Sequence, residues 1–266
     1  MQSTAPAQLL RTSMVAIAIG VASVAAQAGT LNQTGLTKYD TNLRLNNFSG
    51  GTSYANTTLG AVQLTYDGGS AFWAYCIDPK TSASFPSSAY TTNTLAAFMN
   101  DAAGYQGQMQ SSGYTGLSGY GYQSDTATVA SRLQTLYSYA FADSLTSNQK
   151  AAAFGYVVWE IMGSSTASAL SSTSGGGLLA VSDGTADGNS IRDRANQLIN
   201  ALNGTVTWAS IGLTTAASYV YTVYYDPAPH ARQNFLTAHA ASVSLPGTLA
   251  LAGLGLAGAM VLRRRA

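Results

Sequence analysis

The sequence predicts a mainly β protein with α-helices, in which a β-sandwich or barrel-like exported domain holds an inserted cluster of about three helices. Short apolar stretches separated by Gly, Asn, Ser and Thr fill the first half of the chain, as in all-β domains. Strict apolar alternation, typical of half-buried strands, returns near the end. Between these regions, three segments follow the helical period. No repeat with a period of about 20–50 residues is present, which argues against a solenoid or propeller.

The N-terminus predicts a secretory signal peptide over residues 1–28. Arg11 precedes an apolar run over 14–24, and Ala26-Gln27-Ala28 follows it as an A-x-A cleavage site. A positive start, a short apolar core and small residues at the cut are the three parts of such a peptide. Cleavage is therefore expected between Ala28 and Gly29.

The exported domain is expected over residues 29–225, beginning with strands. Residues 61–66 and 70–77 flank Asp67-Gly68-Gly69, a sequence that favours a hairpin turn. Residues 218–225 place alternate side chains on one face, and 233–237 are expected to add an extended segment. The residues on that face are Tyr219, Tyr221, Val223 and Tyr225.

Helices are predicted near residues 125–143, 147–162 and 190–203. Asp125 is a candidate N-cap, Thr146 with Gln149 makes a capping-box pattern, and Gly204 ends the third segment. Their apolar stripes are interpreted as core faces. Two low-complexity stretches, 104–123 and 164–189, are interpreted as loops. The first carries tyrosines that are candidates for stacking on sugar rings, namely Tyr105, Tyr114, Tyr120 and Tyr122.

The C-terminal part predicts a tether over 226–244 and a membrane anchor after it. Residues 245–262 carry no charge and, as a helix, are just long enough for the roughly 30 Å hydrocarbon core. Arg263, Arg264 and Arg265 follow directly, and the positive-inside rule keeps them cytoplasmic. The exported domain then lies on the opposite side of the membrane, in agreement with the signal peptide.

Composition excludes several classes of function. Only 9% of residues are charged and the pI is about 7.8, so no nucleic-acid partner is expected. One cysteine, one glutamate and two histidines (His230 and His239) leave no metal site and no catalytic set, and no cofactor is predicted. Removal of both ends takes away four of the twelve basic residues and none of the eleven acidic ones, so the mature domain has a net charge of −3.

The C-terminal residues resemble a known sorting signal. Pro246, Gly247 and Thr248, the Leu/Ala/Gly segment and the final arginines together resemble the PEP-CTERM signal of Gram-negative bacteria. The family's usual Val-Pro-Glu-Pro-Gly-Thr stands here as Val-Ser-Leu-Pro-Gly-Thr, so the first proline and the glutamate are missing. The resemblance implies recognition by an exosortase, removal of the tail, and export to the cell surface or matrix. It also implies an association with exopolysaccharide and biofilm.

Two internal motifs resemble the surface thioester domains, also called TQXA domains. They are Phe72-Trp73-Ala74-Tyr75-Cys76-Ile77-Asp78 and the segment 151–161, which contains Gly155, Trp159 and Glu160. In that family a cysteine thiolate attacks a glutamine side chain, expels ammonia and leaves an electrophilic thioester. The resemblance puts the glutamine four residues before Trp159, and Gly155 occupies that position. The family's bond therefore cannot form there, and Gln149, ten residues before Trp159, is no substitute.

Cys76 is the one candidate reactive residue, and its role stays open. Packing as a small apolar residue is the first interpretation. A redox or dimer-forming thiol and a thioester with an unrecognised partner are the alternatives. Glu160 is expected to be satisfied by local hydrogen bonds.

The sequence as a whole predicts a non-enzymatic exported protein of the cell surface or extracellular matrix. Its precursor is anchored in the inner membrane, and its partners are the secretion machinery, exosortase and exopolysaccharide. One alternative is an adhesin with thioester-like or carbohydrate-binding activity. Another is a secreted polysaccharide hydrolase, which needs two carboxylates in one cleft. The candidates for that pair are Asp67, Asp78, Asp101 and Asp143.

Overall fold

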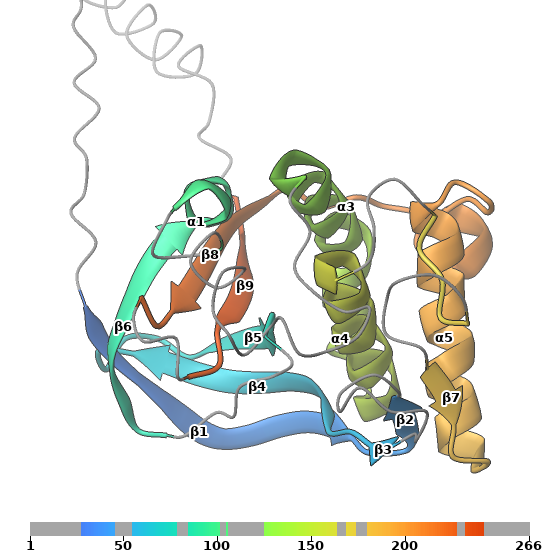
Figure 1. The fold of residues 1–266 in the computed structure, drawn as a ribbon, viewed down its shortest axis with the longest axis horizontal. Coiled ribbons are helices and arrows are strands. Elements are labelled where there is room, and N and C mark those ends of the chain that lie inside the picture. Colours follow the sequence, from blue (N-terminus) through green and yellow to red (C-terminus); the bar gives the residue numbers. More distant parts are fainter. Residues whose placement is uncertain are drawn as a thin grey trace, which may run out of the picture.

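The computed structural model describes residues 28–45, 55–78, 85–101, 105, 125–163, 169–173, 180–227 and 232–241. Within them an antiparallel barrel lies beside a group of helices (Figure 1). This arrangement confirms the predicted fold class. The predicted signal peptide up to Gln27, the membrane segment 245–262 and most of the tyrosine-rich stretch lie outside the described residues.

The barrel closes in the order β1-β4-β5-β9-β8-β6. Its strands are β1 (Gly29–Asp40), β4 (Leu59–Tyr66), β5 (Phe72–Cys76), β6 (Ser87–Thr94), β8 (Tyr219–Tyr225) and β9 (Phe235–Ala240). All neighbouring pairs are antiparallel. Closure gives every strand of this sheet a neighbour on both sides, so the sheet has no edge strand.

The turn between β4 and β5 is the predicted hairpin. Asp67 and Gly68 have φ values of 48° and 71°, as a two-residue hairpin turn requires. The Asp67 carboxylate also accepts a hydrogen bond from the Thr30 amide at 2.6 Å, which joins the turn to the first strand.

Alternation along β8 divides its side chains between two cores. Tyr221, Val223 and Tyr225 belong to the large core that the barrel shares with the helices, whereas Tyr224 lies in a smaller core inside the barrel. The expected tyrosine face is therefore present, and it faces the helices.

The helical group consists of α3 (Thr126–Ser144), α4 (Asn148–Gly163) and α5 (Ala186–Leu202), with the short α1 (Leu95–Asn100) and the 3₁₀ turn η1 (Ala209–Ile211) beside it. Helix α4 packs against α3, α5, β4 and β1, and its residues from Ala151 to Gly163 are all buried. It is therefore the central element of the domain (Figure 1).

The helix starts follow ordinary capping, with one difference from the prediction. The Asp125 carboxylate accepts from the Thr128 amide, and the Thr185 hydroxyl accepts from the Gly188 amide. Helix α4 is capped by Ser147, whose hydroxyl accepts from the Lys150 amide at 3.2 Å, and not by Thr146. The Thr146 hydroxyl instead donates to the Asp143 carbonyl, which closes the preceding helix.

A second, small sheet lies against the helices in the order β3-β2-β7. Its strands are β2 (Leu43–Leu45), β3 (Ala55–Asn56) and β7 (Ala180–Ser182). The stretch 164–189, expected to be a loop, thus contributes a strand and the start of α5. Strand β7 forms because Val181 and its neighbours find a partner strand in Leu43–Leu45, a tertiary contact that composition does not reveal.

The predicted tether over 226–244 is wrong for much of its length. Strand β9 lies between β5 and β8 and closes the barrel, with Phe235, Leu236 and Thr237 fully or almost fully buried. The backbone hydrogen bonds of β9 to β5 and β8, together with its buried apolar side chains, hold this segment in the barrel. The nearby prolines, by contrast, are typical of a linker. In the described part of the chain, no helix has both the length and the apolar character required to cross a membrane.

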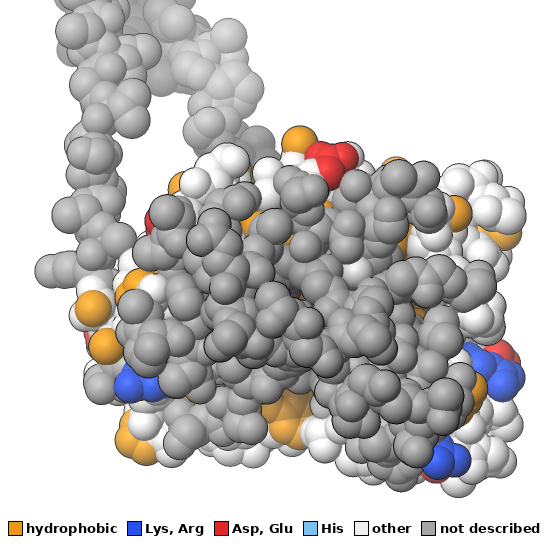
Figure 2. Space-filling model, in the orientation of Figure 1, with side chains coloured by type: hydrophobic (Ala, Val, Ile, Leu, Met, Phe, Trp, Pro, Cys, Tyr) orange, Lys and Arg blue, Asp and Glu red, His pale blue; other side chains and the backbone are white. Residues whose placement is uncertain are grey.

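Among the described side chains visible in Figure 2, those of Lys and Arg lie mainly on the helical side near α5. Charged residues make up only 9% of the sequence.

Candidate functional site

The site is built where β5 ends and β9 begins. Cys76 is the direct cross-strand partner of Phe235, and the Ile77 amide donates to the Asn234 carbonyl at 2.9 Å. The register therefore continues past both strand ends. Gln233 is two residues before Phe235, so it lies diagonally across from Cys76 on the same face of the ladder. Diagonal neighbours of this kind are within reach of a long side chain.

The Gln233 side chain and the Cys76 thiol meet at one acceptor. The Gln233 Nε2 donates to the Asp78 carbonyl oxygen at 3.4 Å, and the Cys76 Sγ lies 3.0 Å from the same oxygen. The backbone carbonyl of Gln233 accepts from the Tyr90 hydroxyl at 2.6 Å. The glutamine is thus held at both its backbone and its side chain, with its carboxamide beside the sulfur.

The Cys76 sulfur contacts the Asp78 backbone, and the Cys76 carbonyl binds a residue of α4. Cys76 Sγ donates to the Asp78 carbonyl at 3.0 Å, and the Asp78 amide lies 3.3 Å from the sulfur. From α4, the Trp159 indole N–H donates to the Cys76 carbonyl at 2.8 Å. Three elements of the chain therefore position this one side chain.

The electrostatics of the site favour a neutral thiol. Burial raises the pKa of Cys76 well above its ordinary value, and the nearby Asp78 carboxylate raises it further. Hydrogen bonds from the Asp78 backbone, Trp159 and Gln233 act in the opposite direction, but burial dominates. The thiol consequently keeps its proton at neutral pH, unlike an exposed redox cysteine, whose pKa is commonly lowered.

Asn234, next to Gln233, adds a second polar side chain to this cluster. The Asn234 side-chain oxygen accepts from the Asp226 amide at 3.0 Å, and Asn234 is fully buried. These two residues connect the end of β8 to the start of β9. The backbone that carries Gln233 is thereby fixed on both sides.

Gly155 has a packing role. A Cβ at this position would meet the Gly60 amide nitrogen at 3.3 Å and a Tyr75 ring carbon at 3.5 Å. The glycine therefore lets α4 approach β4 closely. A side chain there would crowd the β4 backbone, so the position to which the resemblance assigns the family's glutamine holds a close helix–strand contact.

Gln233 is the neighbour of Cys76 that the sequence does not reveal. The sequence places it in an extended segment of the expected tether, and its nearness to Cys76 depends on β9 pairing with β5. The available signal was the apolar strand that begins directly after Gln233 and Asn234, at Phe235. That signal predicts a strand, but it does not say which strand lies beside it.

The four aspartates proposed for a hydrolase have separate structural partners. Asp67 binds the Thr30 amide, Asp101 accepts from the Tyr225 hydroxyl at 2.6 Å, and Asp143 binds Lys150 and Arg194. Asp78 is buried beside Cys76. Glu160 is buried on α4, with the Ser171 amide 3.5 Å from its carboxylate.

The remaining predicted site residues fall mostly outside the described part of the chain. Ala26, the sorting residues Pro246 to Thr248, the arginines 263–265 and His230 are among them. Ala28 is exposed, and Gly29 begins β1. Among the described residues, no group of three or more His, Cys, Asp or Glu side chains is placed to hold a metal ion.

Comparison with known proteins gives three results. A family model described as the PEP-CTERM protein-sorting motif matches residues 242–265. No curated protein matches the chain. Among solved structures, the N-terminal domain of the Streptococcus pyogenes pilus tip adhesin Cpa is similar at 13% identity and a TM-score of 0.39, with 79% of this chain and 97% of that chain covered. The matched motif shows that the chain carries a PEP-CTERM sorting signal, which implies an exported, surface-sorted protein that exosortase processes.

Proposed function

We propose that the chain is a non-enzymatic exported protein of the cell surface or extracellular matrix of a Gram-negative bacterium. In this proposal it is held in the inner membrane through residues 245–262 until exosortase removes the tail, and it then associates with exopolysaccharide. The matched sorting motif at residues 242–265 carries the sorting part of the proposal. The low charged fraction of the sequence, 9%, supports a matrix location.

The fate of the C-terminus tests the sorting step. In a host with its exosortase, surface protein is expected to lack Arg263, Arg264 and Arg265, whereas protein from an exosortase deletion strain keeps them. Mass spectrometry of the C-terminal peptide measures this. Gly247→Leu within the motif is expected to block cleavage, with Ala216→Leu at an exposed position of the exported domain as the control. Intact arginines in surface protein from the wild-type host would refute the proposal.

A second function, adhesion through an internal thioester, is supported by one observation at the site. The Gln233 carboxamide and the Cys76 thiol both bind the Asp78 carbonyl oxygen, at 3.4 and 3.0 Å, so the two side chains are held at the same place. A fixed thiol beside a fixed carboxamide is the arrangement in which the effective concentration of the two groups is high. Cys76 and Gln233 are therefore proposed as the thioester pair that the resemblance failed to find at Gly155.

The proposed step needs no other reactant. The Cys76 sulfur attacks Cδ of Gln233, a sulfur–carbon bond forms, and the carbon–nitrogen bond breaks. The thiol proton leaves with the amide nitrogen as ammonia. A partner's amine later attacks the same carbon, the sulfur–carbon bond breaks, and the proton of the amine returns to the thiol. The protein is then joined to its partner by an amide at Gln233.

Methylamine is the direct probe of this bond. Incubation of the exported domain is expected to place one methylamine on the Gln233 side chain and to release one free thiol at Cys76, which peptide mapping detects. Cys76→Ala removes the reaction, and Gln149→Ala is the matched glutamine control, because the half-buried Gln149 side chain donates to Asp187 at 3.2 Å rather than to a residue of the Cys76 site. Absence of methylamine from Gln233 in the wild-type protein would rule out the thioester.

A further inference from the structure

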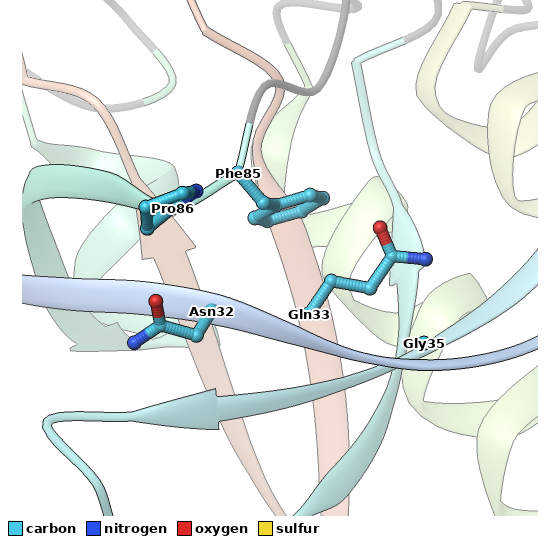
Figure 3. A pocket seen from close by; sticks show the side chains of 5 residues that line it. All are labelled: Asn32, Gln33, Gly35, Phe85 and Pro86. Atoms are coloured by element: carbon cyan, nitrogen blue, oxygen red, sulfur yellow. The ribbon is translucent and has the colours of Figure 1, made fainter.

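A pocket opens beside β1 at the end of the barrel that holds Cys76. Its volume is about 310 Å³, at the small end of ligand pockets. Among the described residues it is lined by Asn32, Gln33, Gly35, Phe85 and Pro86 (Figure 3). The Phe85 ring and the Gln33 carboxamide lie on the same side of β1.

The pocket arises from an irregularity in β1. The register with β4 shifts between Gln33 and Thr37, and Gly35 within this bulge has a φ of +90°. A bulge bends its strand and opens the pairing locally. Only glycine adopts this backbone conformation readily, so the bulge is encoded in the sequence.

One aromatic residue connects the pocket to the Cys76–Gln233 pair. The ring of Phe85 lies 5.8 Å from the ring of Phe235, and Phe235 is the cross-strand partner of Cys76. Phe85 and Cys76 pack against the same small core inside the barrel. The Phe85 and Phe235 rings therefore connect the wall of the pocket to the strand position beside Cys76.

The lining of the pocket selects a class of ligand. It combines an aromatic ring and a proline with two carboxamides, and none of the five residues carries a charge. The amides donate and accept hydrogen bonds, while the ring offers an apolar face. An uncharged ring with one apolar face and several hydroxyl groups, which is a sugar unit, matches both features.

We propose that this pocket is a subsite for one sugar unit of a polysaccharide, and that it brings the amino group of a neighbouring amino sugar in the same chain to the Cys76–Gln233 thioester. The inference rests on the thioester proposed above. The amine attacks Cδ of Gln233, the sulfur–carbon bond breaks, and the thiol takes up the proton of the amine. The product is a polysaccharide joined to the protein through an amide.

Competing probes test the subsite separately from the thioester. The exported domain is treated with methylamine or with chitosan oligosaccharide, which carries free amines, and the rate of adduct formation is followed by intact mass. Methylamine is too small to need the subsite. The wild-type protein is expected to react faster with the oligosaccharide than with methylamine. Phe85→Ala and Gln33→Ala are each expected to lower the ratio of the oligosaccharide rate to the methylamine rate about tenfold, which corresponds to about 1.4 kcal/mol of lost contact. Leu36→Ala, on the same strand with Leu36 57% exposed, is the control.

The outcomes separate the two proposals. An oligosaccharide preference that falls in both pocket variants, and not in the control, supports the subsite. Equal ratios in all variants would overturn it while leaving the thioester in place. If methylamine does not add, the thioester fails, and binding of the fully N-acetylated oligosaccharide is then measured by NMR. Loss of that binding in Gln33→Ala supports a sugar site without coupling, and no binding to the wild-type protein overturns the site.

Discussion

Trp159 joins the central helix to the strand that carries the single cysteine of the chain. Its indole N–H donates to the Cys76 carbonyl at 2.8 Å, and its side chain is 5% exposed. A buried carbonyl that loses its donor costs free energy, because no water replaces the lost bond. At the residue scale, the position of Cys76 therefore depends on one tryptophan that is far away in the sequence.

Replacement of this tryptophan by phenylalanine tests the bond. Trp159→Phe keeps an aromatic ring and removes the N–H, so the free energy of unfolding is expected to fall by about 1–3 kcal/mol. Denaturation in urea measures it. Trp208→Phe is the control, since the Trp208 ring stacks on Tyr139 at 4.7 Å and phenylalanine preserves such stacking. An equal loss in both variants would contradict a specific role for the Trp159 hydrogen bond.

At the scale of the elements, Asp143 connects three helices through ion pairs. From the end of α3 it binds Lys150 of α4 and Arg194 of α5, each at 2.6 Å. Burial by itself raises the pKa of Asp143, but the hydrogen bonds and charges of Lys150 and Arg194 outweigh it, and the pKa is lowered. A lowered carboxylate pKa stabilises the fold above the pKa of the unfolded chain, and this stability is lost as pH falls through the folded pKa.

Because the pKa of Asp143 is lowered, the stability lost on its replacement should depend on pH. Asp143→Asn is expected to lower the free energy of unfolding by about 1–3 kcal/mol at neutral pH, because two charge-assisted hydrogen bonds are lost. The difference from wild type should shrink below about pH 4, where the carboxylate of the unfolded chain is protonated. Asp193→Asn is the control, because Asp193 pairs only with its neighbour Arg192 on an exposed surface. A difference that is constant with pH would contradict the ion-pair role.

At the scale of the whole molecule, the barrel depends on its last strand. Strand β9 pairs with both β5 and β8, so its removal leaves two unpaired edges and exposes the interior core. A chain that ends at residue 241 contains β9, and one that ends at residue 226 does not. The two chains differ in little else.

Truncation shows whether the exported domain ends before or after β9. The chain 29–241 is expected to unfold cooperatively on heating, whereas 29–226 should lack a cooperative transition and near-UV circular dichroism. Open strand edges should also make the shorter chain aggregate. A folded 29–226 chain would restore the interpretation of 226–244 as a tether.

Local sequence patterns predict much of this fold. The site, however, depends on pairing between strands that are far apart in the sequence. The Asp67–Gly68 turn, the β8 alternation and the helix beginning after Asp125 are set by neighbours in the sequence, and the structure contains them. Cys76 was identified because its motif is local. Gln233 was not, because 157 positions of sequence separate it from Cys76 and the pairing of β5 with β9 is a tertiary event. The burial of Asn234 likewise follows from barrel closure.

Intact mass of the exported domain tests the central claim most directly. A bond between Cys76 and Gln233 removes one ammonia, so the wild-type chain 29–241 is expected to weigh one ammonia less than its sequence requires. Cys76→Ala and Gln233→Ala should each show the full mass of their sequences, and Gln149→Ala should keep the deficit. A wild-type domain with its full sequence mass and a free thiol at Cys76 would contradict the account.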